Sequence, residues 1–142
     1  MRRVWTNGVI FTAAVACAAP ALATNWVSVA TSSKGAKIYV DRDSISRSGD
    51  FVTAWEKWDN SATNPPADAW LEKNRKIYDC RNRKIRLSAA VDYRRDGSII
   101  DQFEWAPGEN EFHDAIPESI GEAVLDEVCG TGGAKGVSPP PG

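Results

Sequence analysis

The stretch KIRLSAAVDY, residues Lys84–Tyr93, has the clearest strand pattern in the chain and decides the fold class. Apolar or aromatic residues occupy every second position, and the positions between them are mostly polar. Because successive side chains of a strand point to opposite faces, this alternation predicts a strand with one buried face. The buried set should be Ile85, Leu87, Ala89, Val91 and Tyr93, and the outward set Arg86, Ser88, Ala90 and Asp92.

Turn signals on both sides of this strand predict antiparallel neighbours. Residues 81–83 form a short polar turn after a strand at 76–80, and Asp96-Gly97 favours a hairpin leading into a strand at 99–105, because both residues tolerate positive φ. Upstream, strands are predicted at 26–30, 37–40, 44–47 and 51–59. The proline-containing segment 60–69 is expected to be a long loop. The pattern indicates a meander of about six antiparallel strands.

One amphipathic helix should follow the sheet. Pro117 suits a first helical position, and Gly130 suits the end. Ile120, Ala123, Val124 and Val128 recur at helical spacing on one side. The predicted fold class is therefore α+β, an antiparallel sheet with a C-terminal helix packed on its apolar face.

The two ends of the chain differ in composition from the middle. The N-terminal residues predict a secretory signal at 1–23, with Thr24 as the first mature residue. The features that indicate it are the positive Arg2 and Arg3, an apolar run at 9–19 and the small residues of Ala21-Leu22-Ala23. The alternatives are a membrane anchor, twin-arginine export and lipidation at Cys17. Residues 24–129 form the predicted domain, and the Gly- and Pro-rich residues 130–142 a disordered tail.

Composition narrows the function classes. The chain has 42% hydrophobic and 25% charged residues and a formal net charge of −2, which favours a folded domain and argues against a strongly basic nucleic-acid binder.

After signal removal Cys80 and Cys129 remain, and two cysteines in an exported chain most simply form one disulfide, worth roughly 2–4 kcal/mol. It would join the helix to the sheet. The alternative is two buried free thiols.

Charge is distributed unevenly along the chain. Residues 73–86 contain seven cationic residues and one acidic residue, whereas residues 92–129 contain eleven acidic residues and two arginines. The basic hairpin suggests an anion-binding surface, for which the candidates are Arg81, Arg83, Lys84 and Arg86. Trp70, beside the proline loop, is the favoured exposed aromatic binding residue. The alternative is a solvated face that discourages edge pairing.

Catalytic and metal-binding patterns are weak. His113 and Asp114 are adjacent, but adjacency does not make a base and its orienting group. The chain lacks a phosphate-binding glycine loop and the ligand spacing of a metal site. We therefore expect a protein that is not an enzyme and has no metal or cofactor.

The order and spacing of residues across 26–129 resemble the surface-adhesin protein E family of exported proteobacterial proteins. The residues that carry the resemblance are Trp26, Tyr39-Val40-Asp41, Ser44-Ile45, Gly49, Val52, Trp55, Asp79-Cys80, Arg86, Tyr93, Gly97, Trp105, Pro117 and Val128-Cys129. The loop at 60–69 and the C-terminal tail do not belong to the pattern. The resemblance implies an antiparallel sheet joined to a C-terminal helix by a disulfide.

The family also implies a class of function, because its namesake is an outer-surface adhesin that binds host proteins. The expected function is an exported, non-enzymatic, adhesin-like binding module of the bacterial envelope, located in the periplasm or on the outer surface. Expected partners are host extracellular-matrix proteins or anionic envelope glycans such as lipopolysaccharide, and not nucleic acid. The alternative is a periplasmic structural or stress protein that contacts envelope components. Pairing of sheet edges between two copies of the chain would form a homodimer.

Overall fold

The computed structural model describes residues 24–64 and 66–130 of the chain. The expected signal at 1–23, including Cys17, and the expected tail beyond Gly130 lie outside the described residues. Within the described part, no helix has the length and apolar content needed to cross a membrane.

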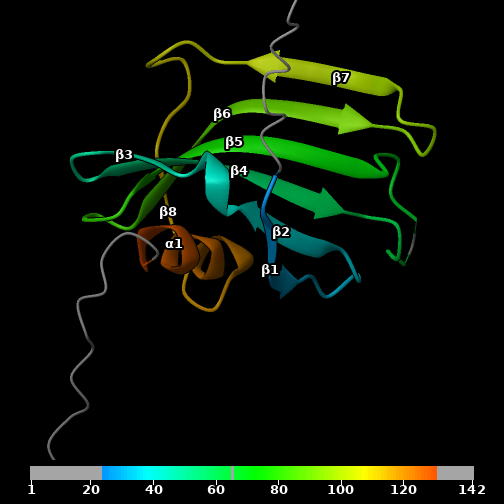
Figure 1. Cartoon of the computed structure of the whole chain (residues 1–142), viewed down its shortest axis with the longest axis horizontal. Coiled ribbons are helices and arrows are strands. Elements are labelled where there is room, and N and C mark those ends of the chain that lie inside the picture. The colour runs from blue at the N-terminus through cyan, green and yellow to red at the C-terminus, as the bar shows by residue number, and fades with distance from the viewer. Residues whose placement is uncertain (1–23, 65, 131–142) are drawn as a thin grey trace, which may run out of the picture.

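The sheet is an antiparallel meander in which six strands follow one another in chain order (Figure 1). The path runs β1 (Trp26–Thr31), β2 (Lys37–Asp41), β4 (Phe51–Asp59), β5 (Leu71–Asp79), β6 (Lys84–Tyr93) and β7 (Ile99–Glu104). Two short strands lie off this path, β3 (Ser46–Ser48) against β4 and β8 (His113–Asp114) against β6. The predicted α+β class and strand order are confirmed.

Local differences from the predicted elements have physical causes. Residues Arg42–Ser44 form a 3-10 turn, η1, because the Asp41 carboxylate accepts the backbone N–H of Asp43. β5 begins at Leu71, earlier than predicted. The helix α1 (Ile120–Gly130) begins after the predicted Pro117, because Ser119 Oγ accepts the backbone N–H of Glu122.

A β-bulge corrects the predicted two faces of β6. Arg75 pairs with Ala89 and Lys76 with Leu87, so Ser88 is an extra residue on β6. The Ser88 hydroxyl occupies the irregularity, donating to the Arg75 carbonyl at 2.9 Å. Beyond the bulge the alternation is inverted, so Val91 and Tyr93 do not share the face of Ile85.

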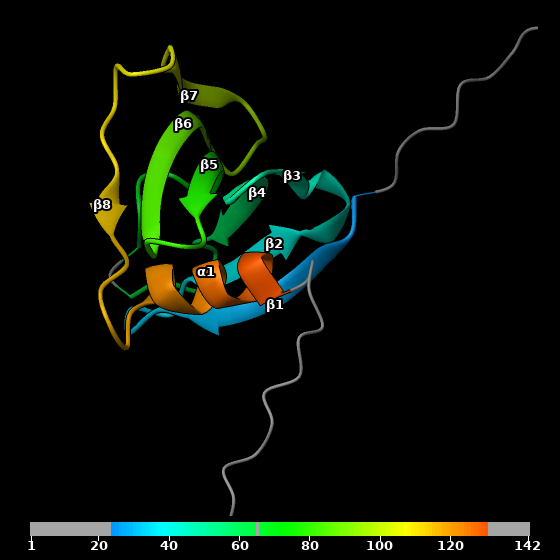
Figure 2. The ribbon, with the colours of Figure 1, turned by 90° about the vertical axis from the view of Figure 1, so that its left-hand side faces the viewer.

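The core lies between one face of the sheet and α1, which contacts β1, β4 and β5. Figure 2 shows α1 near β1 and β2 and away from β7. The buried apolar residues are Ile38, Val40, Val52, Ala54, Tyr78, Val124, Leu125 and Val128. Glu56 is also buried on this face and accepts hydrogen bonds from Tyr78 Oη, from Lys76 Nζ at 2.8 Å and from Trp58 Nε1 at 3.0 Å.

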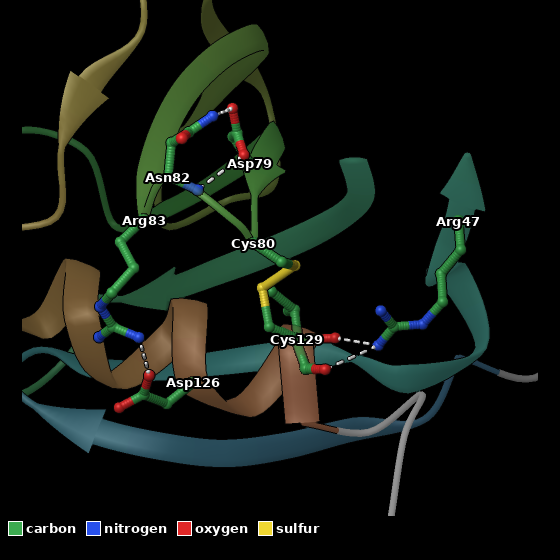
Figure 3. Close-up of a disulfide and its surroundings, with 8 residues drawn as sticks. Arg47, Asp79, Cys80, Asn82, Arg83, Asp126 and Cys129 are labelled. Carbon is green, nitrogen blue, oxygen red and sulfur yellow. Dashed lines mark hydrogen bonds and ion pairs between the residues drawn. A yellow bond between two sulfur atoms is a disulfide. The ribbon is translucent and has the colours of Figure 1, made fainter. Parts of the chain in front are cut away.

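Two contacts hold the C-terminal end of α1 on the sheet (Figure 3). Cys80, which follows β5, forms a disulfide with Cys129, as predicted. Arg47 of β3 donates to the carbonyls of Val128 at 2.6 Å and Cys129 at 3.2 Å. A cation that donates to the last carbonyls of a helix also favours its dipole. The end of the helix is thus anchored both covalently and electrostatically.

Candidate binding face

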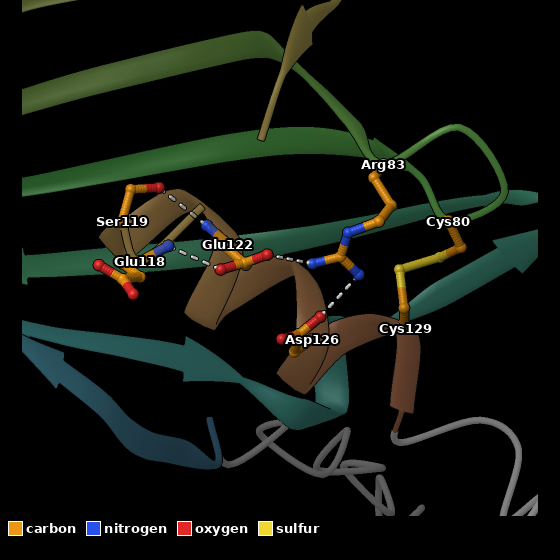
Figure 4. A network of polar contacts seen from close by, with 7 residues as sticks. All are labelled: Cys80, Arg83, Glu118, Ser119, Glu122, Asp126 and Cys129. Carbon is orange, nitrogen blue, oxygen red and sulfur yellow. Dashed lines mark hydrogen bonds and ion pairs between the residues drawn. A yellow bond between two sulfur atoms is a disulfide. The ribbon is translucent and has the colours of Figure 1, made fainter. Parts of the chain in front are cut away.

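Three of the four cations of the predicted basic hairpin form ion pairs within the chain. Arg81 pairs with Asp50 at 2.9 Å, and Lys84 pairs with Asp114 at 3.3 Å. Arg83 reaches α1, where it pairs with Glu122 at 2.8 Å and Asp126 at 2.9 Å (Figure 4). The Arg83 side chain is 46% exposed and is turned toward α1.

The contacts of Arg83 also shift the pKa values of the groups involved. Hydrogen bonds to Asp126 and then to Glu122 raise the pKa of the Arg83 guanidinium above its ordinary value. The pKa of Glu122 is lowered first by the backbone N–H of Glu118 and then by Arg83. Both shifts favour the charged form, so Arg83 and Glu122 are charged at neutral pH.

Arg86, the fourth predicted cation, lies in a different environment. It has no carboxylate partner among the described residues, and its guanidinium carbon lies 4.8 Å from the centre of the Phe112 ring. It lines a cavity of about 620 Å³ on the sheet face opposite α1, together with Arg75 and Trp105. We call this cavity the arginine hollow.

Trp70 does not join the hairpin. It precedes β5 at the end of the strand far from residues 81–83, and its backbone N–H donates to the Tyr93 carbonyl at 2.8 Å. Its side chain is half-buried, and the Arg95 guanidinium lies 5.0 Å from its ring. Whether Trp70 or the hairpin residues bind a ligand stays a prediction.

The sheet face opposite α1 carries a set of aromatic and cationic side chains of which the sequence analysis predicted only Arg86 as a binding residue. We call it the open face and define it by Trp26, Tyr39, Trp55, Lys57, Lys73, Arg75, Arg86 and Tyr93. Lys57 Nζ lies 4.2 Å from the centre of the Tyr39 ring and 4.9 Å from that of Trp26. Lys73 Nζ lies 5.5 Å from the Tyr93 ring. These are cation–π distances.

A second cavity lies among these side chains. It has a volume of about 330 Å³, and we call it the aromatic hollow. Its walls come from five neighbouring strands and include Trp26 of β1, Asp41 of β2, Trp55 of β4, Lys73 of β5 and Tyr93 of β6. The bulge at Ser88 builds this hollow, because it turns Val91 and Tyr93 to the open face.

Arg75 connects the two hollows. Its guanidinium lies 5.9 Å from the Trp55 ring of the aromatic hollow and lines the arginine hollow. Its Nη2 donates to Glu104 Oε1 at 2.9 Å, and its Nε donates to Ser88 Oγ at 3.1 Å. The two hollows therefore lie side by side along β5, in a position to hold one extended ligand.

Residues 24–64 and 66–130 contain no group of three His, Cys, Asp or Glu residues that could hold a metal ion. His113 lies exposed in β8 opposite Ile85, and the neighbouring Asp114 pairs with Lys84.

Comparison with known proteins identifies a family and finds solved structures with the same fold. The family model described as surface-adhesin protein E matches residues 26–130. One crystal form of Haemophilus influenzae protein E is 14% identical, with a TM-score of 0.53 over 80% of this chain and 95% of that chain. Another structure of the same protein is 13% identical, with a TM-score of 0.53 over 80% of this chain and 92% of that chain. No curated protein matches the sequence. The structural likeness, at this identity, shows a shared fold.

Proposed function

The chain belongs to the surface-adhesin protein E family, and we propose that it is an exported, non-enzymatic binding module of the bacterial envelope that holds its ligand on the open face. Its partners are host extracellular-matrix proteins or anionic envelope glycans. Family membership supports an adhesin-like protein of the cell surface. The observation that carries the choice of surface is the pair of adjoining hollows, which α1 leaves uncovered.

Arg86 connects the basic hairpin with this surface. Among the four hairpin cations it lies in the larger hollow and has no carboxylate partner in the described part of the chain. A guanidinium without an internal carboxylate can donate two parallel hydrogen bonds to a ligand carboxylate, sulfate or phosphate. Arg81, Arg83 and Lys84 would first have to give up an internal partner.

Two variants with the same loss of charge test this proposal. Arg86→Gln should reduce retention of the protein on surfaces coated with matrix proteins or with an envelope fraction. Arg81→Gln should leave retention near the wild-type level, because Arg81 is exposed at the turn and paired with Asp50. If both variants lose retention equally, binding belongs to the basic hairpin as a whole. If both variants are retained like the wild type, the open face is not the binding surface.

The second candidate function is a periplasmic structural or stress protein, which would use the same fold inside the envelope. Protease treatment of intact cells separates the two locations. A surface adhesin is degraded under that treatment, whereas a periplasmic protein is protected until the outer membrane is opened. The mature protein should begin at Thr24, and an intact mass that includes a diacylglycerol group on Cys17 would instead identify a lipoprotein.

A further inference from the structure

The open face places two lysines directly opposite each other on neighbouring strands. Lys57 of β4 is the register partner of Lys73 of β5, and side chains paired in this way lie about 5 Å apart at Cβ. Like charges at directly opposed positions destabilise a sheet. Neither lysine bonds a carboxylate within the described residues, and both ammonium groups lie over aromatic rings. An anion from outside the chain would remove the repulsion.

A third lysine, on the core face of the sheet, does have a carboxylate partner within the chain. Lys76, on β5, donates to the buried Glu56 carboxylate at 2.8 Å. The sheet thus supplies a carboxylate in hydrogen-bond contact to this half-buried lysine on the core side, whereas on the open face Lys57 has only the more distant charge of Asp59 and Lys73 forms no ion pair among the described residues. The difference indicates that the two open-face lysines serve a ligand rather than the fold.

The length of the surface favours an extended ligand. Lys73 is four residues from Ile77 on β5, about 14 Å at 3.4 Å per residue, and Ile77 pairs with Arg86. A single small anion would occupy only one end of this surface. A polymer would contact Lys57 and Lys73 in the aromatic hollow and Arg86 in the arginine hollow.

The acidic groups of the open face restrict the charge pattern of that polymer. Asp41 lines the aromatic hollow, and Glu104 lines the arginine hollow. A uniformly charged phosphate chain would meet these carboxylates and be repelled. A polymer with separated anionic groups and hydroxyls between them can accept hydrogen bonds from the cations and donate hydrogen bonds to the carboxylates.

The half-buried rings of Trp26, Trp55 and Tyr93 add a flat apolar floor between the charged groups. The apolar face of a sugar ring fits such a floor. A sulfate ester carries three terminal oxygens, so one group can accept hydrogen bonds from two ammonium groups together. Resting on the binding function proposed above, we infer that the open face binds a sulfated polysaccharide, with one sulfate held between Lys57 and Lys73.

Binding to immobilised heparin, measured with the chain that begins at Thr24, tests the inference. The double variant Lys57→Gln/Lys73→Gln should bind roughly tenfold or more weakly, the size expected when charge-assisted hydrogen bonds are lost. Its thermal midpoint should be equal to or above that of the wild type, because the like-charge pair is gone. The control Lys34→Gln/Arg81→Gln removes the same charge from exposed positions outside the open face and should bind like the wild type.

Ligand controls separate sulfate recognition from general charge attraction. Desulfated heparin, neutral dextran and single-stranded DNA should bind weakly compared with heparin. Heparin binding should weaken as salt rises, since the screening length falls from about 10 Å at 0.1 M to 3 Å at 1 M. DNA binding as tight as heparin binding, or an equal loss in the control variant, would overturn the inference.

The two proposals fail in different ways. If the protein binds matrix proteins or envelope fractions through Arg86 but the lysine double variant binds heparin like the wild type, the sulfate site is wrong and the binding function stands. If Arg86→Gln is retained like the wild type on matrix and envelope surfaces, and the wild type does not bind heparin, both proposals are wrong.

Discussion

Arg83 Nη1 lies 2.9 Å from Asp126 Oδ1, so the turn between β5 and β6 is tied to the helix one turn before Cys129. The same guanidinium also bonds Glu122, one turn earlier on the helix. The disulfide begins at Cys80, three residues before Arg83. The β5–β6 turn therefore holds the helix along most of its length, through Arg83 and Cys80.

Replacing Arg83 should destabilise the protein more than replacing Arg81. Arg83→Ala removes two ion pairs with the helix and should lower the free energy of unfolding by about 1 kcal/mol or less, because all three side chains are partly exposed. Arg81→Ala removes one pair with Asp50, in which the Arg81 side chain is 73% exposed, and should have almost no effect. Urea unfolding at low salt measures both. If both variants lose the same free energy of unfolding, the contacts of Arg83 with α1 do not contribute measurably to stability.

Breaking the disulfide should release the helix before the sheet. The bridge joins residues 49 positions apart, and its loss should cost about 2–4 kcal/mol in a model based on chain entropy. In the variant Cys80→Ser/Cys129→Ser, amide hydrogen exchange should accelerate first in α1, since the strands keep their ladder hydrogen bonds. Thiol labelling of the denatured, unreduced mature protein should find no free thiol. Uniform acceleration across β4, β5 and α1 would contradict this order.

The strand order could be predicted from the sequence, because each turn signal joins neighbouring strands and leaves few alternative topologies. The disulfide followed from the number of cysteines left once the predicted signal is set aside. The open face could not be predicted, because it depends on the bulge at Ser88. The predicted alternation of side chains along residues 84–93 assumes that the strand contains no extra residue. It therefore placed Val91 and Tyr93 on the same face as Ile85, whereas the bulge at Ser88 inverts the alternation.

The role of the hairpin cations was also hidden in the sequence. Whether an arginine in a turn faces solvent or a carboxylate depends on where the helix docks, and that is a tertiary contact. The local pattern showed a run of cations between residues 73 and 86. It could not show that Arg83 meets Asp126 while Arg86 lies opposite α1 in a hollow.

Asp92 should be a site where removing a charge stabilises the protein. Burial, and then the charge of its register partner Asp101, raise the pKa of the Asp92 carboxyl. Because the folded pKa lies above the unfolded value, ionised Asp92 destabilises the fold at neutral pH, and the penalty disappears as pH falls through the folded pKa. Asp92→Asn should therefore raise the free energy of unfolding at pH 7 by roughly 0.2–1 kcal/mol, and the gain should vanish in acid.

Asp96→Asn is the matched control for that measurement. Hydrogen bonds from the Ser98 hydroxyl and backbone N–H lower the pKa of Asp96, so its ionised form is favoured in the fold. This variant should lose stability at pH 7, the opposite sign. Thermal unfolding from pH 3 to pH 8 checks both, and a gain in both variants would mean that net charge alone controls the result.

Tyr78 should control the loss of stability in alkali. Its hydroxyl donates to the buried Glu56 carboxylate, and burial, followed by the Glu56 charge, raises the pKa of Tyr78 well above its ordinary value. The unfolded chain then releases the tyrosine proton at about pH 10 while the folded chain keeps it. This contribution to stability is fully present below pH 10 and decreases as pH rises above it.

The variant Tyr78→Phe isolates that contribution. At pH 7 it should lower the free energy of unfolding by about 1.5–3 kcal/mol, the value of a hydrogen bond to a charged acceptor. Above about pH 10 the difference between wild type and variant should shrink, because only the wild type gains a tyrosinate from Tyr78 on unfolding. Urea unfolding at pH 7, 9 and 10.5 gives the three differences. A constant difference across this range would mean that Tyr78 titrates alike in the folded and unfolded chains, which its buried bond to Glu56 does not allow.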